Sequence, residues 1–308
     1  MDRIHVMQLV RSFQVGELTR RQFVVRATAA LGSASAANLL LAACAESPNP
    51  SPPPVVVEPT AAEPMVTEGV GAAPERVDMS GLARAESVVY GSLGEQALSG
   101  YYVEPEGASG LPAVVMIQEW WGLNPHIEDM ARRLAREGFV VLAPDLYHGA
   151  VTTEPDEARK LVMALDQVAA VQEIEAAADY LLGQDAVSSE KAGVTGFCMG
   201  GGLSLQAGLA SPERFGAVVA FYGSPLSVED AAGMQVPTLG LYGADDNGIP
   251  VADVRAQDEA FETAGIPHEL VVYDGAGHAF MNDTRESFAP EAAADGWARL
   301  LDWFATHL

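Results

Sequence analysis

The sequence predicts an α/β fold, with a mostly parallel sheet, helices on both faces and an antiparallel hairpin at its N-terminal end. From about residue 84 onward, continuous apolar runs typical of strands buried on both faces alternate with amphipathic stretches. Strands that alternate with helices favour a parallel sheet covered on both sides. With 308 residues, of which 49% are hydrophobic, the chain can bury such a core. We therefore expect one domain over residues 84–308.

The elements can be placed in order along the chain. Two β-like runs at 85–90 and 97–104 are separated by Gly-Ser-Leu-Gly at 91–94 and predict the hairpin. Apolar runs predict the remaining strands at 112–117, 139–143, 191–197, 217–221, 238–242 and 269–273. Amphipathic periodicity predicts helices at 127–137, 154–182 with one or more breaks, 199–209, 251–264 and 290–307. Reactive groups in such sheets gather at the carboxyl ends of the strands.

The first 44 residues have the features of an export signal. Thr-Arg-Arg-Gln-Phe-Val at 19–24 is a twin-arginine pattern, and an alanine-rich apolar stretch follows at 27–43. That stretch is short for a membrane-spanning helix and is diluted by polar residues. It ends in Leu-Ala-Ala-Cys at 41–44, which resembles the bacterial lipobox, whose cysteine is acylated and becomes the new N-terminus. We expect an exported lipoprotein held on the extracytoplasmic side by Cys44, although a plain export signal with a chance cysteine stays open.

The segment after the signal is expected to be a tether. Residues 45–75 contain eight prolines, several of them consecutive at 52–54. Proline fixes φ and removes a backbone donor, so such a segment cannot build a core and favours an extended chain. The predicted organisation is therefore a signal at 1–44, a tether at 45–83 and a folded domain at 84–308.

The charge balance limits the partners. The chain has 17 Lys and Arg against 42 Asp and Glu, a formal net charge of −25. Nucleic acid requires clustered cations for its phosphates, so nucleic acid is not an expected partner. Because no polybasic segment would bind anionic lipid, membrane attachment is expected to depend on the acyl chains at Cys44.

The strongest chemical motif is Gly-Phe-Cys-Met-Gly-Gly-Gly at 196–202, which matches the G-x-S-x-G nucleophile elbow with Cys198 in place of serine. The nucleophile of that motif occupies a strained turn between a strand and a helix, and the flanking glycines avoid collisions with the backbone. The turn would place the Met199 N–H beside the thiol at a helix N-terminus, where it can stabilise an oxyanion. The alternative is a glycine-rich turn with an inert cysteine.

A triad also needs an acid and a histidine, which follow the nucleophile in that order in α/β-hydrolases. Gly-Ala-Asp-Asp-Asn-Gly-Ile-Pro at 243–250 follows one predicted strand, and Asp-Gly-Ala-Gly-His-Ala-Phe at 274–280 follows the next. His278 would transfer protons, and Asp245 or Asp246 would fix its tautomer. Three groups in the required order at three strand ends indicate a cysteine-dependent hydrolase.

These motifs resemble the dienelactone hydrolase family. Ile-Gln-Glu-Trp-Trp-Gly-Leu-Asn at 117–124 and Ala-Pro-Asp-Leu-Tyr at 143–147 are similar to that family as well, and the resemblance covers essentially 85–308. The resemblance implies an α/β-hydrolase fold and hydrolysis of lactones and carboxylic esters, typically of the carboxymethylenebutenolide type. It also implies catalysis without a metal or an organic cofactor.

The resemblance further assigns individual residues. It makes Asp246 the triad acid, from its place in the Asp-Asp-Asn-Gly-Ile-Pro loop. It implies that Glu119 holds the resting thiol and takes its proton when substrate arrives. It also implies that the Trp120 N–H is a second oxyanion donor.

The chain departs from the family at two arginine positions. Asn282 stands where family members that act on the dienelactone carry one substrate-binding arginine, and His148-Gly149 lie around the other. Without them a substrate carboxylate loses its bidentate partner, so we expect a neutral or bulkier ester or lactone, unless another cation such as Arg285 replaces them. The expected substrate pocket consists of Trp120, Trp121, Tyr147, Tyr222, Phe280 and Asn282, and the alternative for each aromatic residue is a place in the core.

Two other functions stay open from the sequence. The same triad could serve a thioester hydrolase or an acyl transferase, because these differ only in what the pocket holds. A tethered, non-catalytic binding lipoprotein could also have this fold, since fold does not determine function. An intact triad argues against the binding protein, which has no use for all three groups.

Overall fold

The computed structural model describes residues 78–308. The expected export signal, Cys44 and the expected tether up to residue 77 lie outside the described residues. Within residues 78–308, no helix is both long and apolar enough to span a membrane. The elements in chain order are β1 (Leu82–Leu93), β2 (Gln96–Pro105), β3 (Ala113–Ile117), α4 (Pro125–Arg136), β4 (Val140–Pro144), α5 (Pro155–Ala164), α6 (Gln167–Leu182), β5 (Ala192–Phe197), α7 (Met199–Ala210), β6 (Phe215–Phe221), α8 (Val228–Ala232), β7 (Thr238–Gly243), α9 (Val251–Ala264), β8 (His268–Tyr273) and α10 (Pro290–His307).

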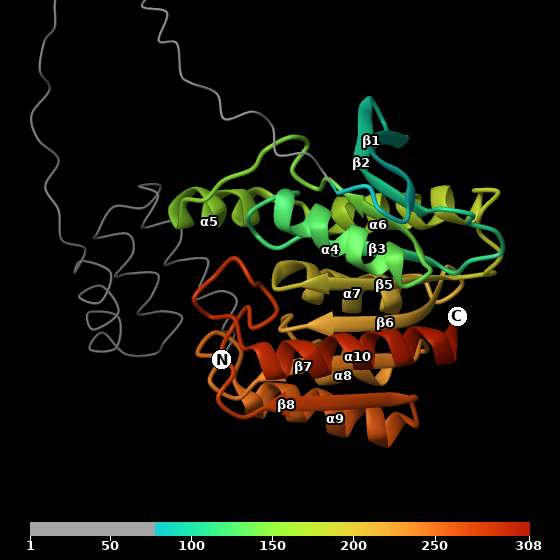
Figure 1. Ribbon diagram of the computed structural model, residues 1–308. Helices are drawn as coiled ribbons and strands as arrows, with labels where there is room; N and C mark the ends of the chain where they lie inside the picture. The colour runs from blue at the N-terminus through green and yellow to red at the C-terminus, as the bar shows by residue number, and fades with distance from the viewer. Residues whose placement is uncertain (1–77) are drawn as a thin grey trace, which may run out of the picture. The chain divides into compact units, whose positions relative to one another are not determined.

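The eight strands form one sheet in the order β1-β2-β4-β3-β5-β6-β7-β8. β1 pairs antiparallel with β2, and β2 pairs antiparallel with β4. All other neighbours pair in parallel, as the arrows of β5 and β6 illustrate (Figure 1). The expected fold, a mostly parallel sheet with an antiparallel N-terminal pair, is confirmed.

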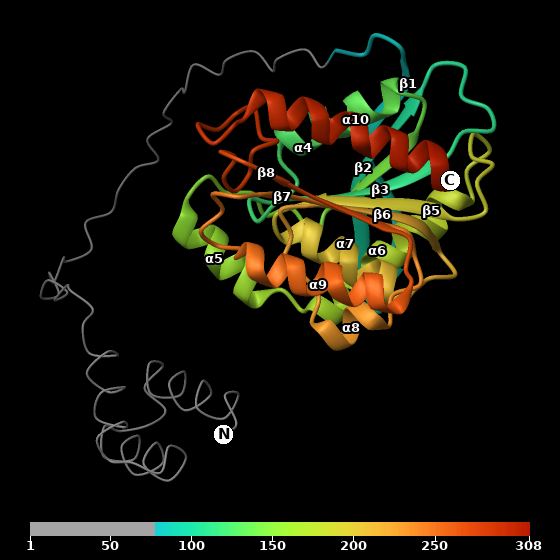
Figure 2. The same cartoon turned by 90° about the horizontal axis from the view of Figure 1, so that it is seen from below.

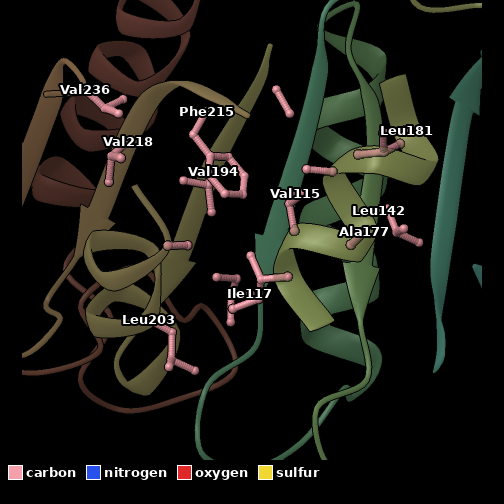
Figure 3. Close-up of a cluster of buried hydrophobic side chains, with 14 of the residues drawn as sticks. Val115, Ile117, Leu142, Ala177, Leu181, Val194, Leu203, Phe215, Val218 and Val236 are labelled. Carbon is pink, nitrogen blue, oxygen red and sulfur yellow. The ribbon is translucent and has the colours of Figure 1, made fainter. Parts of the chain in front are cut away.

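Helices cover both faces of this sheet (Figure 2). Figure 2 shows α4 and α10 on one face and α6, α7, α8 and α9 on the other, and each face has its own buried apolar cluster. Figure 3 shows part of the cluster on the face covered by α6, α7, α8 and α9. In it, Val115, Val194 and Val218 of three strands lie with Ala177 and Leu181 of α6. Because side chains alternate along a strand, buried strands contribute to both clusters, which explains their continuous apolar sequences.

The hairpin turn lies three residues later than its first expected position. β1 continues to Leu93, which pairs with Gln96, so Gly94 and Glu95 alone make the turn. Gly94 has φ +60, a value that glycine adopts without steric cost. Gly91 is part of the strand and pairs with Leu98, after a register shift between Val89 and Gly91. Gly-Ser-Leu-Gly therefore contains both a strand irregularity and the start of the turn.

Two helical details separate the structure from the sequence pattern. The expected break within 154–182 lies at Leu165 and Asp166, between α5 and α6. The Asp166 carboxylate caps α6 by accepting from Val168 N at 3.0 Å and from Ala169 N at 3.2 Å.

The short helix α8 was not expected. It has five residues, too few to show a helical period, and it begins at a Ser227 cap.

Candidate active site

Cys198 lies at the turn between β5 and α7, near the middle of the sheet. Its backbone has φ 57 and ψ −115, a strained conformation for a non-glycine residue. A Cβ on Gly196 would lie 2.3 Å from the Gly200 carbonyl oxygen, and one on Gly200 would lie 2.5 Å from the Ile117 oxygen. Both glycines are therefore needed for the close approach of backbone that forms the turn, as the motif predicts.

Backbone hydrogen bonds hold this turn in place. Cys198 N donates to the Phe221 oxygen at 3.1 Å, and the Cys198 oxygen accepts from Gly201 N at 3.1 Å and Gly202 N at 3.3 Å. Met199 is the first residue of α7, so its N–H has no acceptor within the helix. This N–H adjoins the half-buried Cys198 at the positive end of the helix dipole, where it can stabilise developing negative charge.

Asp246 and His278 meet at the carboxyl ends of β7 and β8. Asp246 Oδ2 lies 2.6 Å from His278 Nδ1, and Oδ1 accepts from Gly248 N at 2.8 Å and from Ile249 N at 3.1 Å. The Asp246 side chain is only 2% exposed, whereas Asp245 is exposed to solvent. Of the two candidate acids, Asp246 is the one that contacts the histidine.

His278 connects this carboxylate with Cys198. Burial alone would lower the pKa of His278, but hydrogen bonds to Cys198 and Asp246, together with their negative charges, raise its pKa to about 9. The Tyr222 ring packs edge-on against the imidazole, with ring centroids 5.2 Å apart. At neutral pH the imidazole therefore carries a proton and lies between Asp246 and Cys198, an arrangement suited to acid–base transfer at sulfur.

The raised pKa of His278 predicts how stability depends on pH. The folded state binds this proton more tightly than the unfolded chain, so the stabilisation is complete below about pH 6.5 and is lost as the pH rises through about 9. Because the His278 side chain is 39% exposed, solvent screening keeps the effect small. In urea unfolding, the excess stability of wild type over His278→Gln should shrink between about pH 6.5 and pH 9.5. A difference that stays constant with pH would contradict this account.

Glu119 follows β3 and is almost fully buried, with 1% of its surface exposed. Its Oε2 accepts from Asn282 Nδ2 at 2.8 Å, and Asn282 Oδ1 in turn accepts from Thr284 Oγ1 at 2.6 Å. Burial raises the pKa of Glu119, against the opposing effects of the Asn282 hydrogen bond and of the positive charges on His278 and Arg285. Burial thus makes the Glu119 carboxylate a stronger proton acceptor than a glutamate in water.

The expected contact between Glu119 and the resting thiol is not observed. Among the described residues the hydrogen bond to Glu119 comes from Asn282, and Cys198 instead acts on His278, whose pKa it raises. In this part of the chain the Glu119 Oε1 atom is buried and has no hydrogen bond of good geometry, although the neighbouring Tyr222 hydroxyl interacts with Glu119 and lowers its pKa. The physical reason is that the buried Asn282 amide donates to Glu119 Oε2 and holds the side chain by that oxygen.

Two cavities meet at Cys198. The larger has a volume of about 590 Å³ and is lined by Glu119, Trp120, Trp121, Cys198, Asp245, Asp246, Asn247, Gly248, Gly277, His278, Ala279, Arg285 and Ser287. The smaller has a volume of about 300 Å³ and is lined by Trp120, Val162, Leu165, Gln167, Cys198, Met199, Gly202, Leu203, Gln206, Tyr222, Ser224, Gly248, Ile249 and His278. We call them the Arg285-side chamber and the α5-side chamber. Cys198 and His278 line both.

Three of the residues expected in the substrate pocket line these chambers. Trp120 borders both chambers, Trp121 borders the Arg285-side chamber and Tyr222 borders the α5-side chamber. The guanidinium carbon of Arg285 lies 4.1 Å from the centre of the Trp121 ring, a cation–π contact that fixes both side chains at the chamber wall. A cation is therefore present near Cys198, although it does not come from the family's arginine positions.

The other three expected pocket residues lie elsewhere. Phe280 is completely buried and packs edge-on against Tyr222, with centroids 5.1 Å apart, so it belongs to the core. Asn282 is 1% exposed and holds Glu119 instead of facing a chamber. Tyr147 lines neither chamber, since its hydroxyl points to Met199 Sδ at 3.2 Å. These three side chains therefore contact residues of the site but line neither chamber.

Some chamber residues could not be found from sequence motifs. Val162 on α5 and Leu165 just after it line the α5-side chamber, and Ser287 lines the other chamber from the loop before α10. They lie outside the motif segments, and hydrophobic residues on a helix are more often part of the core. Only the three-dimensional arrangement brings them to Cys198.

Comparison with known proteins identifies the family. The model of the dienelactone hydrolase family matches residues 98–308, more than half of the chain. The chain belongs to the dienelactone hydrolase family. It is thus a carboxylic ester hydrolase with the α/β-hydrolase fold, as the sequence motifs indicated.

Individual relatives support the same assignment. A provisionally named carboxymethylenebutenolidase of Methylorubrum extorquens is 34% identical over 242 residues, which cover 74% of this chain and 82% of that protein. A provisionally named dienelactone hydrolase of Klebsiella pneumoniae has a similar structure, with a TM-score of 0.68, 33% identity, and coverage of 73% and 99% of the two chains. A dienelactone hydrolase-like promiscuous phosphotriesterase from metagenomic libraries has a TM-score of 0.66 at 28% identity, with coverage of 73% and 98%. The similarity thus extends over nearly the whole length of both solved structures.

Proposed function

We propose that this dienelactone hydrolase-family enzyme cleaves lactones and carboxylic esters through a thioacyl intermediate on Cys198, with His278 and Asp246 completing the triad. The observation that carries the proposal is the 2.6 Å contact between Asp246 and His278, at a cysteine held in the strained turn before α7. The raised pKa of His278 agrees with an imidazolium that supports a thiolate nucleophile.

In the acylation step, the Cys198 sulfur attacks the ester carbonyl carbon and forms the C–S bond. The carbonyl oxygen becomes an oxyanion, which the N–H groups of Met199 and Trp120 stabilise. As the C–O bond to the leaving group breaks, His278 Nε2 gives its proton to the departing oxygen. The products are a thioester on Cys198 and a free alcohol or, with a lactone, the open-chain hydroxyl end of the same molecule.

In the deacylation step, neutral His278 takes a proton from water while the water oxygen attacks the thioester carbon. The C–S bond breaks, the carboxylic acid leaves, and Cys198 returns as a thiolate beside an imidazolium. Asp246 keeps the proton on His278 Nδ1 throughout, because its carboxylate accepts from that nitrogen and is itself fixed by two backbone N–H groups. The proton that His278 gives to the leaving oxygen in acylation is thus replaced by the proton that it takes from water in deacylation.

The direct test is a substrate screen with the purified full-length chain. We expect turnover of p-nitrophenyl esters and small lactones, and the same screen with acyl thioesters tests the thioester hydrolase alternative. Activity on thioesters alone would assign the enzyme to that alternative. Binding without any turnover would support a binding lipoprotein and would contradict the proposal.

We propose that Glu119 accepts the thiol proton when substrate arrives and returns it to the Cys198 thiolate after the acid leaves, so Glu119→Gln should lower kcat on the order of 10²-fold. Burial raises the pKa of Glu119 and so makes it a stronger proton acceptor, and its Oε1, which has no hydrogen bond of good geometry, can receive that proton. The amide keeps the shape of the side chain, so Tm should change little. Glu173→Gln is the matched control, because Glu173 is also a buried acid with a raised pKa but lines neither chamber. Near-normal kcat in Glu119→Gln would refute the role.

We also propose that the enzyme is exported and anchored to a membrane through acylated Cys44. The support is the order of twin arginines, apolar stretch, Leu-Ala-Ala-Cys and proline-rich segment in the first 75 residues. Cys44→Ala should release the enzyme into the soluble fraction with unchanged kcat/KM. Mass spectrometry of the purified protein should find lipid on Cys44 as the first residue, and an unmodified Cys44 would contradict the proposal.

A further inference from the structure

The two chambers at Cys198 differ in charge. The Arg285-side chamber has Glu119, Asp245, Asp246 and Arg285 in its wall. Among the described residues that line the α5-side chamber, none is Asp, Glu, Lys or Arg. Apart from Cys198 and His278, which line both chambers, the α5-side chamber therefore has no charged side chain in its wall, in a chain with a formal net charge of −25. Such a wall favours an apolar group and disfavours a carboxylate.

The side chains of the α5-side chamber come from several elements. Val162 lies on α5 and Leu165 just after it, Leu203 lies on α7, and Ile249 lies in the loop that holds Asp246. Gln167, Gln206 and Ser224 add uncharged polar groups. Leu203 and Ile249 are buried, whereas Val162 and Leu165 are half-buried, so α5 forms the outer wall. The chamber wall therefore contains mostly apolar side chains and includes Cys198.

The direction of proton transfer indicates which part of a substrate enters each chamber. The leaving oxygen must approach His278, and the loop neighbours of that histidine, Gly277 and Ala279, line only the Arg285-side chamber. Met199, whose N–H is the proposed oxyanion donor, lines only the α5-side chamber. With the oxyanion near Met199 and the leaving group near the histidine loop, the acyl chain extends into the α5-side chamber.

We propose that the α5-side chamber is an acyl-chain site, and that the enzyme prefers open-chain esters of uncharged, medium-length apolar carboxylic acids. The proposal rests on the proposed function of Cys198 as the acylated nucleophile. The chamber volume of about 300 Å³ is about ten times the ~30 Å³ that one water occupies in the liquid, and a methylene group is of similar size. An acyl chain of about six to eight carbons therefore fits.

The test compares chain lengths in wild type and two α5-region variants. Leu165→Trp adds bulk inside the chamber, and Met163→Trp is the matched control, because Met163 is 68% exposed and lines neither chamber. Wild-type kcat/KM should rise at least about tenfold from p-nitrophenyl acetate to the hexanoate, since each buried methylene adds binding. Leu165→Trp should remove most of this gain, whereas Met163→Trp should change neither the gain nor the turnover of the acetate.

A second readout does not depend on hydrolysis. S-alkyl methanethiosulfonates transfer their alkylthio group to a thiolate, forming a mixed disulfide and releasing methanesulfinate, and peptide mass spectrometry locates the label on Cys198. The hexyl reagent should label Cys198 faster than the methyl reagent in wild type, and Leu165→Trp should abolish this preference. If no ester is hydrolysed, the proposed function fails, while the labelling preference still supports the acyl site. A labelling rate that is independent of chain length, or equally reduced for both reagents by Leu165→Trp, would overturn the acyl site.

Discussion

Cys198→Ala should lower kcat for p-nitrophenyl esters by a factor on the order of 10⁴ to 10⁶, the largest effect that the proposed mechanism predicts. Removal of the sulfur eliminates the covalent intermediate and leaves only oxyanion stabilisation and substrate binding. The backbone of the turn is held by the Phe221, Gly201 and Gly202 hydrogen bonds, so the fold should persist.

The matched control for this substitution is Cys44→Ala. It removes the other cysteine of the chain and should leave kcat unchanged. Far-ultraviolet circular dichroism and Tm of both variants separate loss of chemistry from loss of fold. If folded Cys198→Ala keeps activity within about tenfold of wild type, Cys198 is not the nucleophile.

His278→Ala should lower kcat on the order of 10³ to 10⁵-fold, because one imidazole serves both acylation and deacylation. It protonates the leaving oxygen in the first step and deprotonates water in the second, so both half-reactions slow.

His268→Ala is the matched control for this prediction. His268 also faces a carboxylate, with Nε2 3.2 Å from Asp258, but it lies at the start of β8 and lines neither chamber. Its removal should change kcat by less than about threefold. Equal losses in the two variants would mean that histidine–carboxylate pairs stabilise this domain in general, and that His278 has no special part in the reaction.

The parts of the fold that depend on apolar patterning could be predicted from the sequence. The buried parallel strands are continuous apolar runs, because they contact helices on both faces. The position of the hairpin turn was harder to predict, since Gly91 and Gly94 are both typical turn residues. Only the strand pairing shows that Gly94 belongs to the turn. Helix α8 was missed because a five-residue helix has little more than one turn of periodicity.

The geometry of the candidate site was predictable where a motif has a steric cause. Gly196 and Gly200 must lack side chains because the backbone of Gly200 and Ile117 occupies that space. Asp246 could be separated from Asp245 only through the family resemblance, and the structure gives the reason: Asp246 is buried against His278, while Asp245 is exposed.

The pocket wall was the least predictable part. Aromatic residues near a motif can face a cavity or the core, and sequence alone does not distinguish these environments. Phe280 lies only two residues from His278 yet is fully buried, whereas Arg285, farther along, reaches the chamber through its contact with Trp121. Val162 lies on α5 and Leu165 just after it, in a segment that no motif connects with Cys198.

The central claim is that catalysis proceeds through a thioester on Cys198, and trapping that intermediate tests it most directly. The full-length chain is mixed with excess p-nitrophenyl hexanoate, quenched in acid within the first turnover, digested and analysed by mass spectrometry. The account predicts a hexanoyl group on the peptide that contains Cys198, at a higher level in wild type than in His278→Ala. A hexanoyl group on a serine or histidine, with Cys198 unmodified while p-nitrophenol is released, would contradict the account.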